Sequence, residues 1–402
     1  MRPSVTEAWT RNTGGSSYCC KDDGREQEVL LERTVSDLIR EEYHYWLANI
    51  PGFGAIRIDQ LLQVFKTAEK LYHADASSLM RLAQLKEEEV GKLVSSRDCN
   101  KIREAYQKLQ DKKIRFLTKE DPEYPIRLKN IYGAPFALYV KGSLPPDHRK
   151  TLAVIGARDC SAYGMEIAKY LSGAVAREGI AVISGLARGI DSCAHIGALN
   201  AGGSTYGVLG CGVDICYPKE NINLYMELQR DGGILSEYAP GIQPIASHFP
   251  MRNRIISGLS DGILVIEARK KSGTLITVDI GLEQGKNIYA LPGRITDQLS
   301  TGCNNLIKMG AKPVTSPEDI LEDFQIYPCV NHSEYPTDSH LSPEELKIYQ
   351  VLNQEPKHLE DISVMTQFPL SQLTEHLLSM EMSGIIRQAM RNYYVLCQTL
   401  SS

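Results

Sequence analysis

The sequence lacks the patterns by which several protein classes are recognised. Its 402 residues contain no run of 18 apolar side chains, so we expect no membrane span and no membrane partner. The first residues carry no apolar signal core, which favours a cytoplasmic protein. Ten cysteines are present, but no two have the CxxC spacing of a zinc site. We therefore expect free thiols, with no metal and no disulfide framework.

Several enzyme motifs are also missing. The sequence has no G-x-x-x-x-G-K-[ST] phosphate loop, no G-x-S-x-G elbow and no H-E-x-x-H pair, which argues against the corresponding nucleotide hydrolases, serine hydrolases and zinc proteases. The first core strand is followed by Gly156-Ala157-Arg158 rather than G-x-G-x-x-G, which weakens a dinucleotide-binding interpretation. No nucleophile–base pair is evident, so we expect a protein that is not an enzyme and needs no cofactor.

The charge is unevenly distributed along the chain. The net charge is −5, and residues 331–402 hold nine acidic and four basic side chains, which accounts for all of it. Residues 1–330 are therefore neutral overall. A nucleic-acid site in this chain must be a local basic pocket rather than a basic face.

The N-terminal part divides into two segments. Residues 1–34 show no periodicity, and we predict that they are unstructured. Residues 35–112 are predicted to form a helical domain, because apolar residues recur at helical spacing. The Pro51-Gly52-Phe53-Gly54 turn resembles that of a helix-hairpin-helix, so the domain is expected to be of the helix-hairpin-helix or SAM type. A tight turn at Ile50–Gly54 either grips a DNA phosphate or simply joins two helices. A second helical stretch is predicted over Leu79–Val94.

Residues 113–321 are predicted to form an α/β core with a Rossmann-like, mainly parallel sheet. Apolar runs alternate with helical patterns such as Met165–Arg177 and Leu275–Gln284, and this order is typical of a parallel sheet covered on both faces. A further apolar helix is expected to begin at Ile255, directly after Arg252-Asn253-Arg254. The predicted strands are Ile114–Thr118, Ala137–Lys141, Leu152–Ile155, Ala181–Ser184, Thr205–Leu209, Gly233–Ser236, Gly262–Glu267 and Asn287–Ala290.

The C-terminal part begins with a Pro-rich linker, residues 322–342. Residues 343–402 show three helical stretches and a hairpin, the order of a winged-helix domain. Its third helix would present Ser371, Gln372, Thr374, Glu375 and His376. This face has no Lys or Arg, which favours a protein-interaction or regulatory module over a major-groove reader.

Glycine and basic residues gather after the core strands. In a doubly wound sheet, ligands bind beyond the carboxyl ends of the strands. Glycine lets the backbone approach a ligand, while helix N-termini, Arg and Lys bind phosphate. We therefore predict a phosphate-binding pocket, and the residues selected for it are Gly156, Arg158, Gly185, Arg188, Gly212, Lys219, Asn253, Arg254, Ser272, Gly273 and Thr274.

Other polar residues near these loops have simpler roles. We expect Asp191 and Asp214 to cap helices or tie loops together. His195 is expected to be a packed, hydrogen-bonded histidine. Glu237 and Glu267 are expected to hold arginines of the pocket in place rather than to act as general acid and base.

The same loops resemble those of a known family. The matching strings are VIGAR at 154–158, SGLARGID at 184–191, GCGVD at 210–214, YPK at 217–219, FPMRNRIISGLS at 249–260 and SGTLIT at 272–277. They are similar to those of the DprA family of DNA-processing proteins, also called Smf. The resemblance covers the whole core, and both flanks fit the family's helical N-terminal domain and C-terminal winged helix.

The resemblance implies a binding protein of natural transformation. It implies that the chain binds and protects incoming single-stranded DNA, forms a homodimer through the Rossmann-like core, and helps to load the RecA recombinase. Arg158 and Lys219 would be the leading DNA contacts, with Asn253, Arg254 and Gly273-Thr274 lining the same pocket.

Two alternatives stay open. The sheet could belong to a nucleotide hydrolase of the phosphoribohydrolase type, although Lys271-Ser272-Gly273-Thr274 matches the Pro-Gly-Gly-x-Gly-Thr loop of those enzymes only in part. The chain could instead be a scaffold whose acidic winged helix binds a partner. The residues alone support a phosphate ligand, and the choice of single-stranded DNA comes from the family resemblance.

Overall fold

The structure, a computed structural model, describes residues 38–326, 341–352, 356–383 and 385–396. The chain separates into two compact units, Met1–Asp111 and Lys112–Ser402. The segment 1–34 and residues 327–340 of the predicted linker lie outside the described residues. No helix in the described part of the chain is long and apolar enough to cross a membrane.

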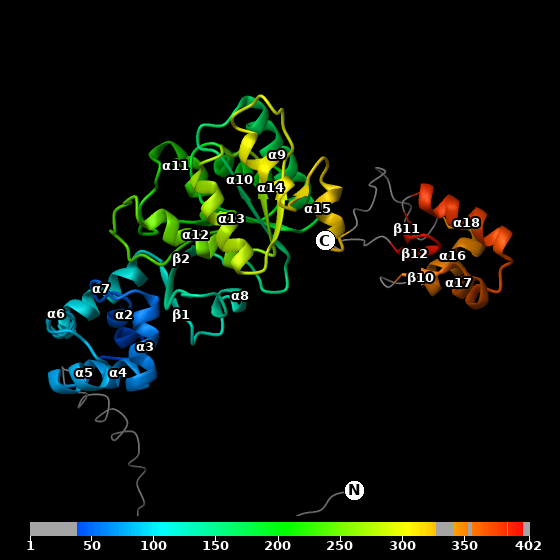
Figure 1. The fold of residues 1–402 in the computed structure, drawn as a ribbon. Helices are drawn as coiled ribbons and strands as arrows, with labels where there is room; N and C mark the ends of the chain where they lie inside the picture. Colours follow the sequence, from blue (N-terminus) through cyan, green and yellow to red (C-terminus); the bar gives the residue numbers. More distant parts are fainter. Residues whose placement is uncertain (1–37, 327–340, 353–355, 384, 397–402) are drawn as a thin grey trace, which may run out of the picture. The chain divides into compact units, whose positions relative to one another are not determined.

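The first unit is helical in its described residues (Figure 1). Its turn at Ile50–Gly54 depends on Gly52, whose φ of +85° lies in the left-handed region that favours glycine. The single helix predicted over Leu79–Val94 is wrong. Gln84 has a φ of +51° and ends the first helix, as left-handed residues commonly do after a helix C-terminus. The helices are α2 Arg40–Ala48, α3 Ala55–Phe65, α4 Ala68–His73, α5 Ala76–Leu82, α6 Glu87–Ser95 and α7 Cys99–Asp111.

The core contains the predicted sheet. The strand order is β1-β2-β6-β5-β4-β3-β7-β8-β9, and the strands from β6 to β9 pair in parallel. Strand β2 pairs antiparallel with both β1 and β6. The strands are β1 Arg115–Thr118, β2 Ala137–Gly142, β3 Thr151–Ile155, β4 Ala181–Ser184, β5 Thr205–Val208, β6 Gly233–Ser236, β7 Gly262–Val265, β8 Asn287–Ala290 and β9 Lys312–Pro313.

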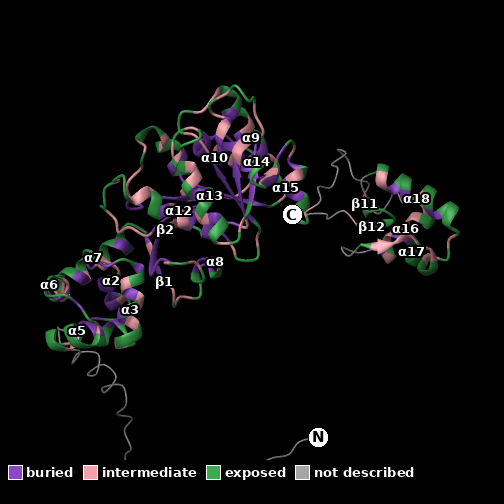
Figure 2. Ribbon diagram, viewed as in Figure 1, coloured by how far each residue is buried: buried purple, intermediate pink, exposed green. Residues whose placement is uncertain are grey.

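Helices cover both faces of this sheet, which leaves the central strands buried (Figure 2). Successive residues of β3 alternate between the two apolar layers: Leu152 and Val154 pack into one, and Ala153 and Ile155 into the other. This is the period of two that a strand imposes. The helices are α8 Ile126–Lys129, α9 Ala162–Arg177, α10 Ile190–Asn200, the 3₁₀ turn η1 Lys219–Asn221, α11 Ile222–Asp231, α12 His248–Leu259, α13 Gly273–Glu283, α14 Thr301–Lys308 and α15 Glu318–Asp323.

Two predicted boundaries in the core are wrong. The core does not end at Leu321, because α15 continues to Asp323 and Phe324 is buried in the apolar layer that contains β3 residues. The apolar helix expected to begin at Ile255 begins at His248. The helix therefore includes Arg252, Asn253 and Arg254, and its 3.6-residue period determines the direction in which each side chain points.

The C-terminal part has the winged-helix order, α16 Pro343–Val351, β10 Lys357–His358, α17 Leu359–Thr366, α18 Leu370–Met382, β11 Ile386–Met390 and β12 Tyr393–Leu396. Its small sheet has the order β10-β12-β11. Ser342 caps α16 by accepting a hydrogen bond from the Glu345 N–H. Leu373, Leu377 and Met380 of α18 are fully buried, so the polar side chains predicted to face outward do so, with His376 partly covered.

Candidate functional site

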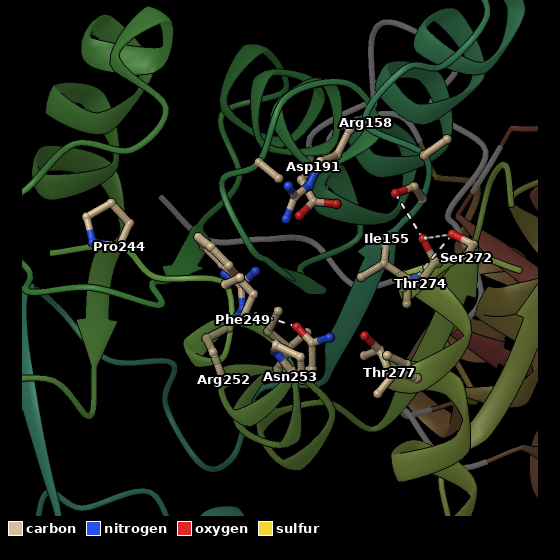
Figure 3. Close-up of a pocket in the computed structure, with 18 of the residues that line it drawn as sticks. Ile155, Arg158, Asp191, Pro244, Phe249, Arg252, Asn253, Ser272, Thr274 and Thr277 are labelled. Carbon is tan, nitrogen blue, oxygen red and sulfur yellow. Dashed lines mark hydrogen bonds between the residues drawn. The ribbon is translucent and has the colours of Figure 1, made fainter.

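A cavity of about 560 Å³ opens where β3 and β7 end (Figure 3). It lies beyond the carboxyl ends of parallel strands, where ligands of such sheets bind. Six of the predicted site residues line it: Gly156, Arg158, Asn253, Ser272, Gly273 and Thr274.

A second cavity, of about 450 Å³, adjoins the first. Arg158, Tyr217 and Phe249 line both cavities, so the two form one continuous depression. Three more predicted residues line the second cavity: Gly185, Arg188 and Lys219. The structure thus brings together residues from loops that are separated by more than 100 positions in the sequence.

The loop after β3 is fixed by its neighbours. The Thr274 hydroxyl donates to the Gly156 carbonyl oxygen at 3.1 Å, and the Ser272 hydroxyl caps α13 by accepting from the Thr274 N–H. A Cβ on Gly156 would lie 2.6 Å from Ile190, so only glycine fits this close approach. These contacts hold the backbone that carries Arg158 in one position.

Arg158 is exposed and lies over an aromatic ring. Its guanidinium carbon is 5.3 Å from the centre of the Phe249 ring, within the range of a cation–π contact. The Phe249 ring also lies 5.7 Å from the Tyr217 ring, with their planes tilted by 31°. The depression therefore combines cations with aromatic faces, a combination that suits a ligand with both phosphates and planar rings.

The cation below this surface is Arg252, which is 5% exposed. Its guanidinium donates to the carbonyl oxygens of Gly185 and Val208. Gly185 directly follows β4, and Val208 is the last residue of the neighbouring strand β5. A Cβ on Gly185 would lie 2.6 Å from that guanidinium and 2.7 Å from the Asp191 carboxylate. The glycine therefore makes room for a buried arginine and a buried carboxylate.

Burial shifts the pKa of both charged groups. Burial lowers the pKa of Arg252 to about 10, although Asp191 opposes this shift. Burial raises the pKa of Asp191, although Arg252 and the N–H groups of Ala187 and Gly185 favour its charged form. Arg252 stays charged at neutral pH and adds positive potential beneath the cavity floor. Asp191 ties the loop to α10, as we expected.

Two predicted site residues do not line either cavity. Arg254 donates to both carboxylate oxygens of Glu237 at 2.7 Å, so Glu237 holds this arginine as expected but away from the depression. The Gly212 N–H donates to the Ile242 carbonyl oxygen, and a Cβ there would meet the Ala239 oxygen at 2.7 Å. Gly212 therefore packs one loop against another.

The expectation for Glu267 was wrong. Glu267 does not hold an arginine, because its carboxylate accepts hydrogen bonds from the N–H and the hydroxyl of Ser161 at 2.9 and 2.5 Å.

Arg188 reaches the second cavity but is partly neutralised by Asp159 at 3.7 Å. Among the described residues, no group of three or more His, Cys, Asp or Glu side chains is placed to hold a metal ion.

The selection from sequence missed Arg252, Phe249 and Tyr217. A signal for Arg252 was present, because it shares one helical stripe with three buried residues: Ile255, Ile256 and Leu259. Spacings of three, four and seven residues put these side chains on the same face of a helix. If the helix is taken to begin at His248, this spacing predicts that Arg252, and not Arg254, is the arginine whose side chain faces the core.

His195 is packed and hydrogen-bonded, as expected. It is fully buried on α10, with Nδ1 2.6 Å from the Thr205 hydroxyl and with no partner for Nε2 among the described residues. Burial lowers its pKa from 6.5 to about 3. The unfolded chain then binds more protons than the folded chain between these values, so stability is complete above about pH 6.5 and is lost as the pH falls.

We expect the loss to approach about 1.4 kcal/mol per pH unit well below pH 6.5. Urea unfolding at several pH values between 7.5 and 4.5 measures it, and His195→Gln should flatten the dependence. An equally steep dependence in His195→Gln would show that another group causes the acid loss.

Comparison with known proteins decides the family. The family model described as "DNA recombination-mediator protein A" matches residues 115–325, and that of the "DprA winged helix domain" matches residues 332–389. Protein Smf of Synechocystis is 31% identical over 391 residues, which cover 87% of this chain and 98% of that protein. The chain belongs to the DprA/Smf family.

Two further comparisons agree. The DNA processing protein DprA of Streptococcus pneumoniae is 45% identical over 205 residues, 51% of this chain and 72% of that protein. The X-ray structure of S. pneumoniae DprA matches with a TM-score of 0.63 and 34% identity, covering 70% of this chain and 97% of that one. The family, the Rossmann-like core and the winged helix predicted from sequence are thereby confirmed, and membership places the chain among the DNA-processing proteins of recombination.

Proposed function

We propose that this DprA/Smf protein binds single-stranded DNA in the depression formed by the two cavities. The observation that supports this most is the pairing of exposed Arg158 with the Phe249 ring at the junction of both cavities. Arg158 and Lys219 contact phosphates, and the rings of Phe249 and Tyr217 contact bases. Bases offer their faces for stacking only where the strand is unpaired.

The depression holds its ligand and does not cleave it. Glu267 is the carboxylate that a phosphoribohydrolase would need, yet it is 3% exposed and both of its oxygens accept bonds from Ser161. These two hydrogen bonds to the N-cap residue of α9 keep the carboxylate from acting as an acid or base towards a ligand. This geometry supports a binding protein over a hydrolase.

In the cell, the bound strand is incoming DNA of natural transformation, which the protein protects and presents to the RecA recombinase. Support comes from the description of the matching family as a recombination mediator. The active form is a homodimer joined through the Rossmann-like core.

Arg158→Ala tests the binding site. Each phosphate contact contributes about −0.7 to the slope of log affinity against log salt for a single strand. The variant should therefore bind all oligonucleotide sequences about fivefold more weakly at 0.1 M salt, with a slope reduced by about 0.7. Fluorescence anisotropy over a salt series measures both quantities.

The matched control is Arg177→Ala, which removes an exposed arginine at the end of α9. It should leave affinity and slope unchanged. Wild-type affinity in Arg158→Ala would show that the depression is not the DNA site.

A further inference from the structure

Four cations outside the described cavities gather next to them. Arg269, Lys270 and Lys271 lie in the loop between β7 and α13, and Arg294 lies in the loop between β8 and α14. All four side chains are exposed. Within the described residues, none of the four takes part in an ion pair or a side-chain hydrogen bond. We call these four residues the outer patch.

Backbone contacts join the two loops that carry the outer patch. The Ala268 N–H donates to the Leu299 carbonyl oxygen at 2.8 Å, and the Gly302 N–H donates to the Ala268 carbonyl oxygen at 2.7 Å. A Cβ on Gly302 would lie 2.6 Å from that same oxygen. The residue before Arg269 is therefore attached directly to the second loop.

The second loop has a defined shape of its own. The Asn304 side chain bonds both the N–H and the carbonyl oxygen of Gly293, at 3.2 and 3.0 Å. The Asp297 N–H donates to the Arg294 carbonyl oxygen at 3.1 Å. This loop presents Ile295, which is 94% exposed, beside Arg294. An apolar side chain next to an unpaired cation suits a ligand with sugar or base surface as well as phosphate.

The outer patch directly adjoins a wall of the first cavity along the chain. Ser272, Gly273 and Thr274 form one wall of the first cavity, and Lys271 immediately precedes them. Along the sheet the order is β5, β4, β3, β7, β8, all parallel. The loops after these strands carry, in the same order, Lys219, Arg188, Arg158, the three cations from Arg269, and Arg294. At about 4.8 Å per strand, the row extends for about 19 Å.

We propose that the outer patch is a second segment of the DNA site, which takes the phosphates of the strand after it leaves the cavity over β7 and β8. This inference rests on the proposed function, because the same strand must occupy the cavity. The cavity binds a few nucleotides, and the outer patch makes longer strands bind more tightly. Acidic side chains also lie along the row: Asp159 beside Arg188, Glu220 beside Lys219, and Asp297 in the loop of Arg294, where it accepts a hydrogen bond from the Leu299 N–H.

The test compares short and long oligothymidylates, of about four and about 20 nucleotides, on the full chain. The triple variant Arg269→Gln, Lys270→Gln, Lys271→Gln should bind the short oligomer as the wild type does. It should bind the long oligomer at least about tenfold more weakly at 0.1 M salt, with a salt slope reduced by about 2. Adding Arg294→Gln should deepen the loss for the long oligomer alone.

The matched control removes three exposed cations that lie elsewhere, Lys129, Lys150 and Lys308, as glutamines. Lys150 directly precedes β3, so it lies at the amino ends of the strands, opposite the carboxyl ends where the cavity opens. Equal losses in this control would show a general charge effect and overturn the proposal. It would also be overturned if the outer-patch variant bound long strands normally, or if it lost the short and long oligomers alike. Failure of the wild type to bind either oligomer would instead refute the proposed function itself.

Discussion

Replacing Arg252 with methionine is expected to lower the free energy of unfolding of the core by about 3–5 kcal/mol, because a buried carboxylate loses its compensating charge. Asp191 would remain buried, and its pKa would rise further. The carbonyl oxygens of Gly185 and Val208 would lose a donor from the guanidinium that now reaches both. Urea unfolding of the full chain, followed at the core transition, measures the loss.

Two variants show whether the buried pair is the cause. Arg177→Met removes an exposed arginine and should change stability by less than about 0.5 kcal/mol. Adding Asp191→Asn to Arg252→Met should recover part of the loss, because removal of both charges leaves neither one uncompensated. A loss below about 1 kcal/mol in Arg252→Met, with no recovery in the double variant, would contradict this account.

The sheet could be predicted from sequence because each central strand is a continuous apolar run. Seven predicted strands overlap the observed ones closely, and the eighth, Gly262–Glu267, extends two residues too far. Glu267 lies two residues beyond the end of β7, where its carboxylate accepts hydrogen bonds from Ser161, a contact that no local sequence pattern contains. Strands β9 and β10 were missed because each has two residues, too few for a period of two to show.

The site was predictable to the level of its loops but not of its side chains. Strand order brings the Gly-rich loops to the carboxyl ends of the strands, so the sequence could predict that Arg158 and Lys219 line a common depression there. The direction of Arg254 depends on Glu237, a partner 17 positions earlier, and no local pattern contains that information. Arg252 was missed because the start of α12 was placed seven residues too late, which obscured the stripe it shares with Ile255.

The second large effect is expected from Gly189→Ala. Gly189 has a φ of +77°, and a Cβ there would lie 2.5 Å from the Arg158 carbonyl oxygen and even closer to that of Ala157. Left-handed strain of about 1–2 kcal/mol then adds to about 1–3 kcal/mol of overpacking. We expect a loss of stability of about 2–5 kcal/mol, measured by urea unfolding. The backbone of Arg158 must also shift, so affinity for single-stranded DNA should fall with stability.

Gly179→Ala separates the cost of left-handed backbone strain from the cost of overpacking. Gly179 follows α9 with a φ of +80°, and nothing lies within 4 Å of a Cβ there. This variant should therefore lose only about 1–2 kcal/mol, the left-handed strain alone, and should bind DNA normally. The difference between the two glycines measures how tightly the loop of Arg158 is packed against the start of α10. If both variants lost the same free energy of unfolding and bound DNA with the same affinity, the loop would accommodate the added Cβ without cost, and its packing would not position Arg158.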